Sequence, residues 1–436
     1  MQGRSLQRSA STGWALVGWS VACLVVAVVR NRLWATPNLA LFVEAARHLG
    51  SPERLGSTSG AYVLTNWSGE AFARLVGATT PNRYVLVHLG LAVAGLAVGV
   101  RLTIRRFGTA LAAALAGVLA ASPAVTVVFT WLGQPDALTL PLGLGVTIAR
   151  GRVAAVMCAV ALGATHGEQG VFLVLVAAAV RLAIEPFRLA GAAEGTVDPS
   201  LGPAGDEPVA VRGVRPVPGP STHRWSARYA VEAVTLLAGV LVGRLAVEGY
   251  LRLAGLRNSA GRTHFLDIGV GEFLRQHGRS GVWLPLALWG VLWPAILAAA
   301  TVVVRRRATM GGDVVLLARV LCASAVAAVV PMLITLDETR VYAMVTSPLL
   351  VGGAVLAVAV VDRLGIGVRP TVAAVTVVLV LVVPGVFTAG GVHRSTSLPP
   401  REFARFLLDG TVPGGADRLT PWLLGPFDVT VPTVSR

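Results

Sequence analysis

Long apolar stretches alternate along the chain with short basic or glycine-rich breaks. A helix that spans a bilayer needs about 20 mainly apolar residues. Candidate spans cover residues 13–29, 84–100, 109–130, 136–149, 153–165, 169–185, 229–251, 282–304, 314–335, 341–361 and 370–388. The pattern therefore predicts an all-α polytopic membrane protein with about 11 transmembrane helices.

Composition and charge support this prediction. Hydrophobic residues make up 54% of the chain and charged residues only 14%, whereas a soluble domain carries roughly a quarter charged residues. The net charge of +15 comes from arginine clusters that punctuate apolar runs, which is typical of cytoplasmic loops. We therefore expect a membrane-lipid environment and no nucleic-acid partner. The absence of lysine and the abundance of alanine, glycine and valine indicate a bacterial plasma membrane protein.

Strict alternation of the spans from a cytoplasmic N-terminus places the tight arginine clusters inside. It predicts an N-terminal transmembrane bundle over 1–186, with an outer loop over 30–82. A proline- and glycine-rich segment over 187–227 is predicted to be a disordered cytoplasmic linker, because it cannot bury enough apolar surface to fold. A second bundle follows over 228–388. The tail, 389–436, is then expected outside.

Two amphipathic stretches occur in the outer loop, and we expect both to form helices in the membrane interface. In the first, an apolar side is formed by Leu39, Phe42, Val43 and Ala46. The second begins near Ser68, and its apolar positions are Phe72, Leu75 and Val76. Glu44 falls on the polar side of the first stretch.

Three polar turns are predicted to share the outer face with this loop. They contribute Gln134 and Asp136, then His166, Glu168 and Gln169, and then Asp337 and Arg340. Carboxylates near hydrocarbon are costly unless paired, so they are candidates for function. Each also has a structural reading, because aspartate favours helix N-caps and charges at i, i+3 form local pairs of small energetic value.

These residue types suit transfer chemistry. Glu44, Asp136, His166 and Glu168 are candidate catalytic groups, because a carboxylate or imidazole with a shifted pKa can act as a general base. Gln134, Gln169, Asp337 and Arg340 are candidate substrate-binding groups, and an arginine binds phosphate with two parallel hydrogen bonds. A divalent cation is possible, although no spacing identifies a metal site. Arg244 and Glu248 stand at i, i+4 in a predicted span, and we expect them to pair.

The layout resembles the GT-C class of membrane glycosyltransferases, which use sugars linked to polyprenyl phosphate. In that class a large outer loop follows the first span, carries two juxtamembrane helices and usually supplies a catalytic aspartate or glutamate. Here no aspartate occurs between Arg30 and Arg83. Either Glu44 takes that role, or the base lies elsewhere, at Asp136 or Glu168.

The resemblance implies a glycosyltransferase that moves a sugar from a lipid-linked donor to an envelope acceptor at the outer face. Two other functions stay open at this stage. A transporter or lipid flippase typically has inverted repeats and polar groups at mid-membrane, whereas here the polar groups gather at one face. A non-catalytic subunit of an envelope complex would explain the missing aspartate. The sequence leaves the sugar, the acceptor and the oligomeric state open.

Overall fold

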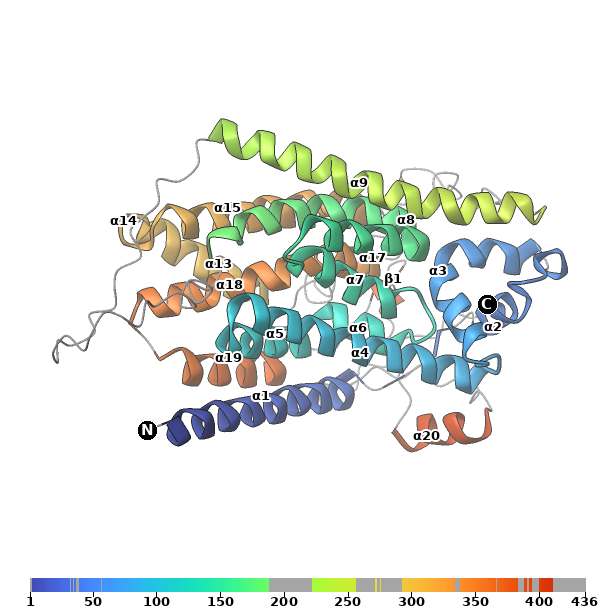
Figure 1. Ribbon diagram of the computed structural model, residues 1–436, viewed down its shortest axis with the longest axis horizontal. Helices are drawn as coiled ribbons and strands as arrows, with labels where there is room; N and C mark the ends of the chain where they lie inside the picture. Colours follow the sequence, from blue (N-terminus) through green and yellow to red (C-terminus); the bar gives the residue numbers. More distant parts are fainter. Residues whose placement is uncertain are drawn as a thin grey trace.

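Helices make up almost all of the computed structural model (Figure 1). The residues described are 2–31, 33, 35–36, 39–55, 57–187, 222–255, 271–272, 275, 292–333, 338–365, 367–382, 388–389, 392–393 and 400–410. Most of the expected linker therefore lies outside the described residues, as do most of the expected loop after residue 252 and the end of the tail.

The helices follow the predicted apolar stretches closely. In the first half they are α1 Gln2–Asn31, α2 Leu39–His48, α3 Ser57–Leu75, α4 Pro81–Phe107, α5 Thr109–Ala121, α6 Pro123–Thr130, α7 Asp136–Ile148 and α8 Arg152–Ala183. In the second half they are α9 Thr222–Leu253, α13 Leu292–Arg305, α14 Arg307–Met310, α15 Gly312–Ala327, α16 Val329–Leu333, α17 Glu338–Val345, α18 Ser347–Arg363, α19 Val368–Val382 and α20 Pro400–Asp409. Two short 3-10 turns lie at Pro52–Arg54 and Glu185–Phe187, and the strands β1 Thr388–Ala389 and β2 Val392–His393 pair antiparallel.

Large apolar side chains face outward along several helices, as in a protein surrounded by lipid. Those more than half exposed include Val17, Val21, Val25, Val29, Val153, Met157, Leu241 and Leu245. By length and composition, four of the described helices can cross a membrane, or up to six if each of two bent pairs forms one span. The chain is therefore an all-helical, multi-pass membrane protein, and a count of eleven spans stays a prediction.

Helix α8 is a hairpin of two helical arms. Its backbone leaves helical geometry at His166, where φ is −150° and ψ is 77°. Arg152 and Arg181 lie near its two ends, yet both contact the carboxylate of Glu232, at 3.5 and 2.9 Å. In a straight helix they would be more than 40 Å apart, at about 1.5 Å per residue. The chain therefore reverses at His166, where the sequence predicts a turn between two spans.

Two buried arginines hold the C-terminal end of α7. The Arg106 Nη1 donates to the carbonyl oxygen of Ile148 at 2.8 Å, and the Arg181 Nη1 donates to those of Val146 and Ala149 at 2.7 Å. The last carbonyls of a helix lack intrahelical partners, and cations favour that end. We call this side of the bundle, with Arg106, Arg152 and Arg181, the arginine end.

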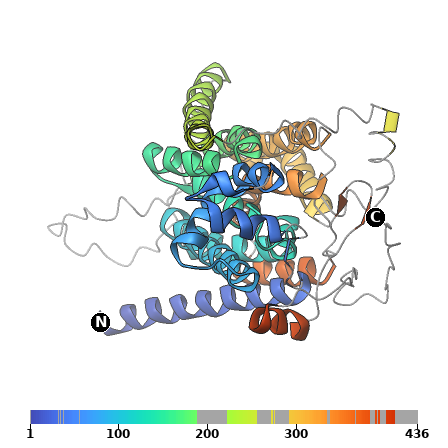
Figure 2. The same ribbon diagram turned by 90° about the vertical axis from the view of Figure 1, so that its right-hand side faces the viewer.

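Helix α7 stops well short of its neighbour α4. Both have their C-terminal ends at the arginine end, but α7 has 13 residues and α4 has 27, which correspond to about 20 and 40 Å. The space beyond α7 is covered by α2 and α3, which lie across the opposite side of the bundle (Figure 2). We call that side, with α2 and α3, the loop end.

The first amphipathic stretch folds as predicted. Helix α2 buries the expected face completely or nearly so, from Phe42 at 0% exposure to Leu39 at 5%. The second differs from the prediction, because α3 already begins at Ser57 and contains a break at Asn66, where φ is −146° and ψ is 34°. Beyond that break Phe72, Leu75 and Val76 are exposed. The opposite face of α3 therefore packs on the protein.

The C-terminal segment returns to the loop end. Helix α20 buries Phe403 and Phe406 in the cluster that contains Phe42 and Tyr84. The Asn82 Nδ2, at the start of α4, donates to a carbonyl oxygen of α20 at 3.0 Å. Amphipathic packing of this kind fixes α20 on the same side of the bundle as α2 and α3.

Close packing between α8 and α9 depends on glycine. A Cβ at Gly163 would lie 2.0 Å from the carbonyl oxygen of Val240, and one at Gly243 would lie 2.0 Å from that of Val160. Small residues let transmembrane helices approach this closely. Gly249, on the same helix as Gly243, has nothing within 4 Å of its Cβ position.

We expect Gly243→Ala to lower the melting temperature of the purified protein, because the added methyl forces α9 away from α8 at a cost of roughly 1–3 kcal/mol. The matched control is Gly249→Ala, which adds the same group in open space. It should leave stability unchanged or raise it, since alanine is favoured over glycine in a helix by about 1 kcal/mol. Equal melting temperatures for the two variants would show that this helix contact is not close.

Candidate functional site

A buried ion pair joins two elements far apart in the sequence at the loop end. The Arg340 Nε of α17 donates to the Asp136 Oδ2 of α7 at 2.7 Å. The Asp136 side chain is 0% exposed and that of Arg340 is 12% exposed. The guanidinium also lies 5.7 Å from the ring centroid of Trp131. Desolvated pairs of this kind are strongly coupled, because removal of one partner strands the other charge.

The turn between α6 and α7 brings the first loop to this pair. Leu132 forms a short parallel bridge with Ala35, and the backbone N of Thr36 donates to the carbonyl oxygen of Leu132 at 2.9 Å. The Gln134 Nε2 donates to the Thr36 Oγ1 at 2.8 Å. Gly133, which lies between Leu132 and Gln134, has a φ of +102°, in the region where glycine has no steric penalty. The turn is therefore fixed by contacts from residues just after α1.

Asn66 is a hub beside the same turn. Its Nδ2 lies 3.0 Å from the Tyr84 OH, 3.1 Å from the Gly133 carbonyl oxygen and 3.0 Å from the His88 Nε2, and its two N–H groups are shared among these three acceptors. The His88 Nδ1 donates to the Tyr84 carbonyl oxygen at 2.9 Å, which leaves Nε2 as an acceptor. A Cβ at Gly69 would meet the Asn66 amide at 2.5 Å and His88 at 2.6 Å. The break in α3 thus positions a buried polar group against α4 and the turn.

Glu70 lies on the same buried face of α3. Its side chain is 0% exposed, and within the described part of the chain neither carboxyl oxygen has a hydrogen-bond partner. Burial raises the pKa of Glu70 well above its usual range, because the charged form loses its hydration. A carboxyl group in such a position is held in its neutral form over an extended pH range.

The tip of the α8 hairpin forms a second cluster of polar residues at the loop end. His166 and Gln169 are buried, and the Gln169 backbone N donates to the His166 Nδ1 at 3.4 Å. Glu168 is about half exposed and pairs with Arg244 of α9 at 3.4 Å. Arg244 also pairs with Glu248 at 2.9 Å, so the predicted i, i+4 pair is present.

Among the predicted site residues, the structure pairs Asp136 with Arg340 of α17, and Gln134 stands two residues before Asp136 in the turn that leads into α7. His166, Glu168 and Gln169 gather at the neighbouring hairpin tip. Glu44 is half-buried on α2, and Asp337 lies outside the described residues. Within the described ranges, no three histidine, cysteine or acidic side chains lie close enough to hold a metal ion.

The sequence did not single out Asn66, Glu70, Tyr84 and His88 as site residues. A signal for the first two was present in α3. Phe72, Leu75 and Val76 form an apolar face of the kind that contacts lipid. The opposite face then has to contact protein, and Asn66 and Glu70 lie on it at i, i+4. The partners on α4 could be found only from the tertiary structure.

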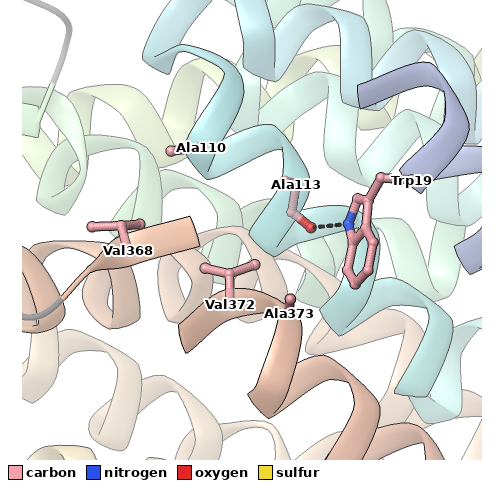
Figure 3. Close-up of a pocket in the computed structure, with 6 residues that line it drawn as sticks. All are labelled: Trp19, Ala110, Ala113, Val368, Val372 and Ala373. Atoms are coloured by element: carbon pink, nitrogen blue, oxygen red, sulfur yellow. Dashed lines mark hydrogen bonds between the residues drawn. The ribbon is translucent and has the colours of Figure 1, made fainter. Parts of the chain in front are cut away.

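A separate cavity of about 130 Å³ lies between α1, α5 and α19 (Figure 3). Trp19 lines it and donates from Nε1 to the Ala113 carbonyl oxygen at 3.0 Å. Its other lining residues are Ala110, Ala113, Val368, Val372 and Ala373. Because Ala110 and Val368 stand in the first turns of α5 and α19, the cavity is near the arginine end. It is apolar and distinct from the polar groups at the loop end.

No family model, no curated protein and no solved structure matches this chain.

The raised pKa of Glu70 predicts how stability depends on pH. The folded protein holds the Glu70 proton more tightly than the unfolded chain, so this contribution is complete below the ordinary glutamate pKa of about 4.3. It is lost as pH rises through the raised value. Glu70→Gln keeps the size and removes the titration. We therefore expect the difference between the melting temperature of Glu70→Gln and that of the wild type to shift in favour of the variant as pH rises above 4.5.

The matched control is Glu44→Gln, which removes a carboxyl group from α2, the neighbouring helix of the same loop. Thermal unfolding would be followed for both variants and the wild type from about pH 4, near the ordinary glutamate pKa, to about pH 9. A difference between Glu70→Gln and wild type that does not change with pH would contradict the assignment of a buried neutral carboxyl group.

Proposed function

We propose that this chain is a glycosyltransferase of the GT-C kind. It transfers a sugar from a polyprenyl-phosphate donor to a cell-envelope glycan or lipid. The observation that carries the proposal is the seating of the buried Asp136–Arg340 pair beneath α2 and α3, the two helices of the loop after α1. That arrangement agrees with the class layout, in which the first outer loop covers the catalytic groups.

The geometry also suits the chemistry. The acceptor hydroxyl attacks the anomeric carbon, the bond to the phosphate oxygen breaks, and polyprenyl phosphate leaves. A guanidinium carries five N–H donors, so Arg340 binds the leaving phosphate through a bidentate contact. The phosphate then competes with Asp136 for Arg340. The Asp136 carboxylate, released from the ion pair, takes the proton of the acceptor hydroxyl.

The depth of the site is favourable for a lipid-linked donor. Asp136 begins a helix of 13 residues, and about 20 Å is less than the thickness of a hydrocarbon core of about 30 Å. Its carboxylate is therefore recessed from the end of α4 and can meet a phosphate at the boundary between lipid and water. We further propose that α1, α7, α13, α19 and each of the two arms of α8 are spans. With α4, the α5–α6 pair, α9, α15 with α16, and the α17–α18 pair, the total is eleven.

We propose a bacterial plasma membrane as the location, with the arginine end in the cytoplasm and the loop end outside. The positive-inside rule supports this orientation, because arginines gather at the arginine end. The N-terminus is then cytoplasmic. The loop after α1 and the C-terminal tail lie outside, where envelope glycans are the available acceptors.

Asp136→Asn and Arg340→Lys should each abolish turnover, which is compared per molecule of folded protein because loss of one partner of the buried pair also lowers stability. The first keeps shape and removes charge, and the second keeps charge but removes the planar fork that binds phosphate. Glu44→Gln should retain activity, because that residue is half-buried on α2 and outside the turn that holds the pair. The measurement is release of polyprenyl phosphate from a panel of polyprenyl-phosphate monosaccharides by purified protein.

Asp313→Asn and Arg363→Lys provide matched controls. Asp313 and Arg363 form another aspartate–arginine pair, at 3.0 Å, with side chains about one-third exposed. It lies near the arginine end, so its variants should retain turnover. If Glu44→Gln alone is inactive, the base belongs to the first loop. If all of the loop-end variants keep full activity, the ion pair is structural and the proposed function is wrong.

The orientation can be tested separately by cysteine labelling. Cysteines at Ser57 and Ser221, introduced into a chain whose three native cysteines have been replaced, should label oppositely with an impermeant thiol reagent in intact cells. Ser57 should react and Ser221 should not, because the arginine clusters place the two positions on opposite sides. Equal labelling of both positions would contradict the proposed threading.

A further inference from the structure

Several buried polar atoms without hydrogen-bond partners lie on α3 and on the part of α9 that packs against it. Within the described part of the chain they are Glu70 Oε1, Glu70 Oε2, Trp67 Nε1, Tyr250 OH and Asn66 Oδ1. Few buried polar groups in native proteins lack a partner, and each one costs about 1–3 kcal/mol. A group of them on one face of one helix indicates a ligand that supplies the missing partners.

The side chains that carry these atoms are neighbours. The rings of Trp67 and Tyr250 lie 6.0 Å apart with an interplanar angle of 62°. Both pack in one apolar cluster with Ala71 of α3 and Ala164 of α8. Trp67 and Glu70 stand at i, i+3 on α3, so they share one face of that helix. The fully buried Glu70 carboxyl group therefore lies on the side of α3 that carries Trp67.

The chemistry of the set selects a sugar. The indole N–H only donates, the amide oxygen only accepts, and the neutral carboxyl group and the phenol do both. Adjacent hydroxyl groups of a sugar donate and accept in the same way, and its C–H face packs on an aromatic ring. A metal cation would use only the oxygens of Glu70 and Asn66 and would leave the Trp67 donor without a partner.

Charge separates this set from the Asp136–Arg340 pair. Arg340 attracts a phosphate, whereas Trp67, Glu70 and Tyr250 carry no positive charge, so the lipid phosphate and the Glu70 set belong to different parts of the loop end. Asn66 connects the two parts, because its Nδ2 donates to the Gly133 carbonyl oxygen at 3.1 Å, three residues before Asp136. A neutral sugar held at Glu70 would therefore lie beside the donor phosphate.

We propose that Trp67, Glu70 and Tyr250 form a subsite for a neutral sugar ring of the acceptor. The subsite is closed in this structure, since its polar atoms are buried. Entry of a sugar requires the segment of α3 after Asn66 to shift, and the helix is already broken at that residue. That the bound sugar is the acceptor rests on the proposed function. That the subsite binds a neutral sugar is independent of that function.

The test is direct binding of neutral methyl glycosides to the full-length protein in detergent, measured by saturation-transfer NMR. The panel contains the methyl glycosides of common hexoses and pentoses, without phosphate or lipid. We expect at least one to bind the wild type. Glu70→Gln, Tyr250→Phe and Trp67→Phe should each weaken that binding about tenfold, because each variant removes a hydrogen bond to the sugar.

The matched control is Trp225→Phe. Trp225 stacks on Tyr229 at 5.6 Å near the start of α9, and its Nε1 is also buried without a hydrogen-bond partner within the described ranges. Trp225→Phe should bind the glycoside as the wild type does. The melting temperatures of all four variants show whether each is folded. If Trp67→Phe fails to fold, Glu70→Gln, which retains an amide oxygen, still tests the subsite.

Two outcomes overturn the proposal: no glycoside in the panel binds the wild type, or binding is equally strong in Glu70→Gln and Tyr250→Phe. Both leave the proposed function intact, because that function is measured by release of polyprenyl phosphate. Conversely, glycoside binding that depends on Glu70, together with no release from any donor, would support the subsite and contradict the transferase.

Discussion

The backbone carbonyls at the C-terminal end of α7 accept hydrogen bonds from Arg106 and Arg181, and the depth of the site depends on this contact. The two arginines belong to α4 and α8, so the contact sets the level of three helices at once. Removal of either arginine would leave the final carbonyls of a buried helix without partners. Glu232 balances the charge of Arg181 at 2.9 Å.

The C-terminal end of α7 is held at the arginine end and the helix is short. Its N-terminal end is therefore well inside the bundle. Asp136 at that end is fully buried, and only its pair with Arg340 makes a charge there tolerable. Such a pair gives little net stability compared with apolar side chains of similar size, yet loss of one partner costs about 3–5 kcal/mol. We interpret the retention of a costly pair at this depth as a sign of function.

Helices α2 and α3 complete the site because they fill the space above α7. Helix α2 does so with an apolar face, and α3 does so with a polar one that includes Asn66 and Glu70. Helix α3 is broken, its apolar face points outward and its carboxyl group points inward. Burial of that carboxyl group without a hydrogen bond lowers the stability of the protein. That cost is reasonable if the inward groups bind a ligand, and it accounts for the position of the break at Asn66 next to the turn before Asp136.

The sequence by itself predicted the helical membrane fold, the turn at His166 and the apolar side of α2, and it singled out Asp136 and Arg340 as candidate site residues. Those features follow from local hydrophobic periodicity and from the cost of charge near lipid, which act along the chain. Tertiary structure decided which polar groups meet. The pair of Asp136 and Arg340 spans 204 residues, and Glu70 faces inward only because α4 and α9 pack against α3. Contacts between distant segments depend on how helices pack, and no local pattern encodes that packing.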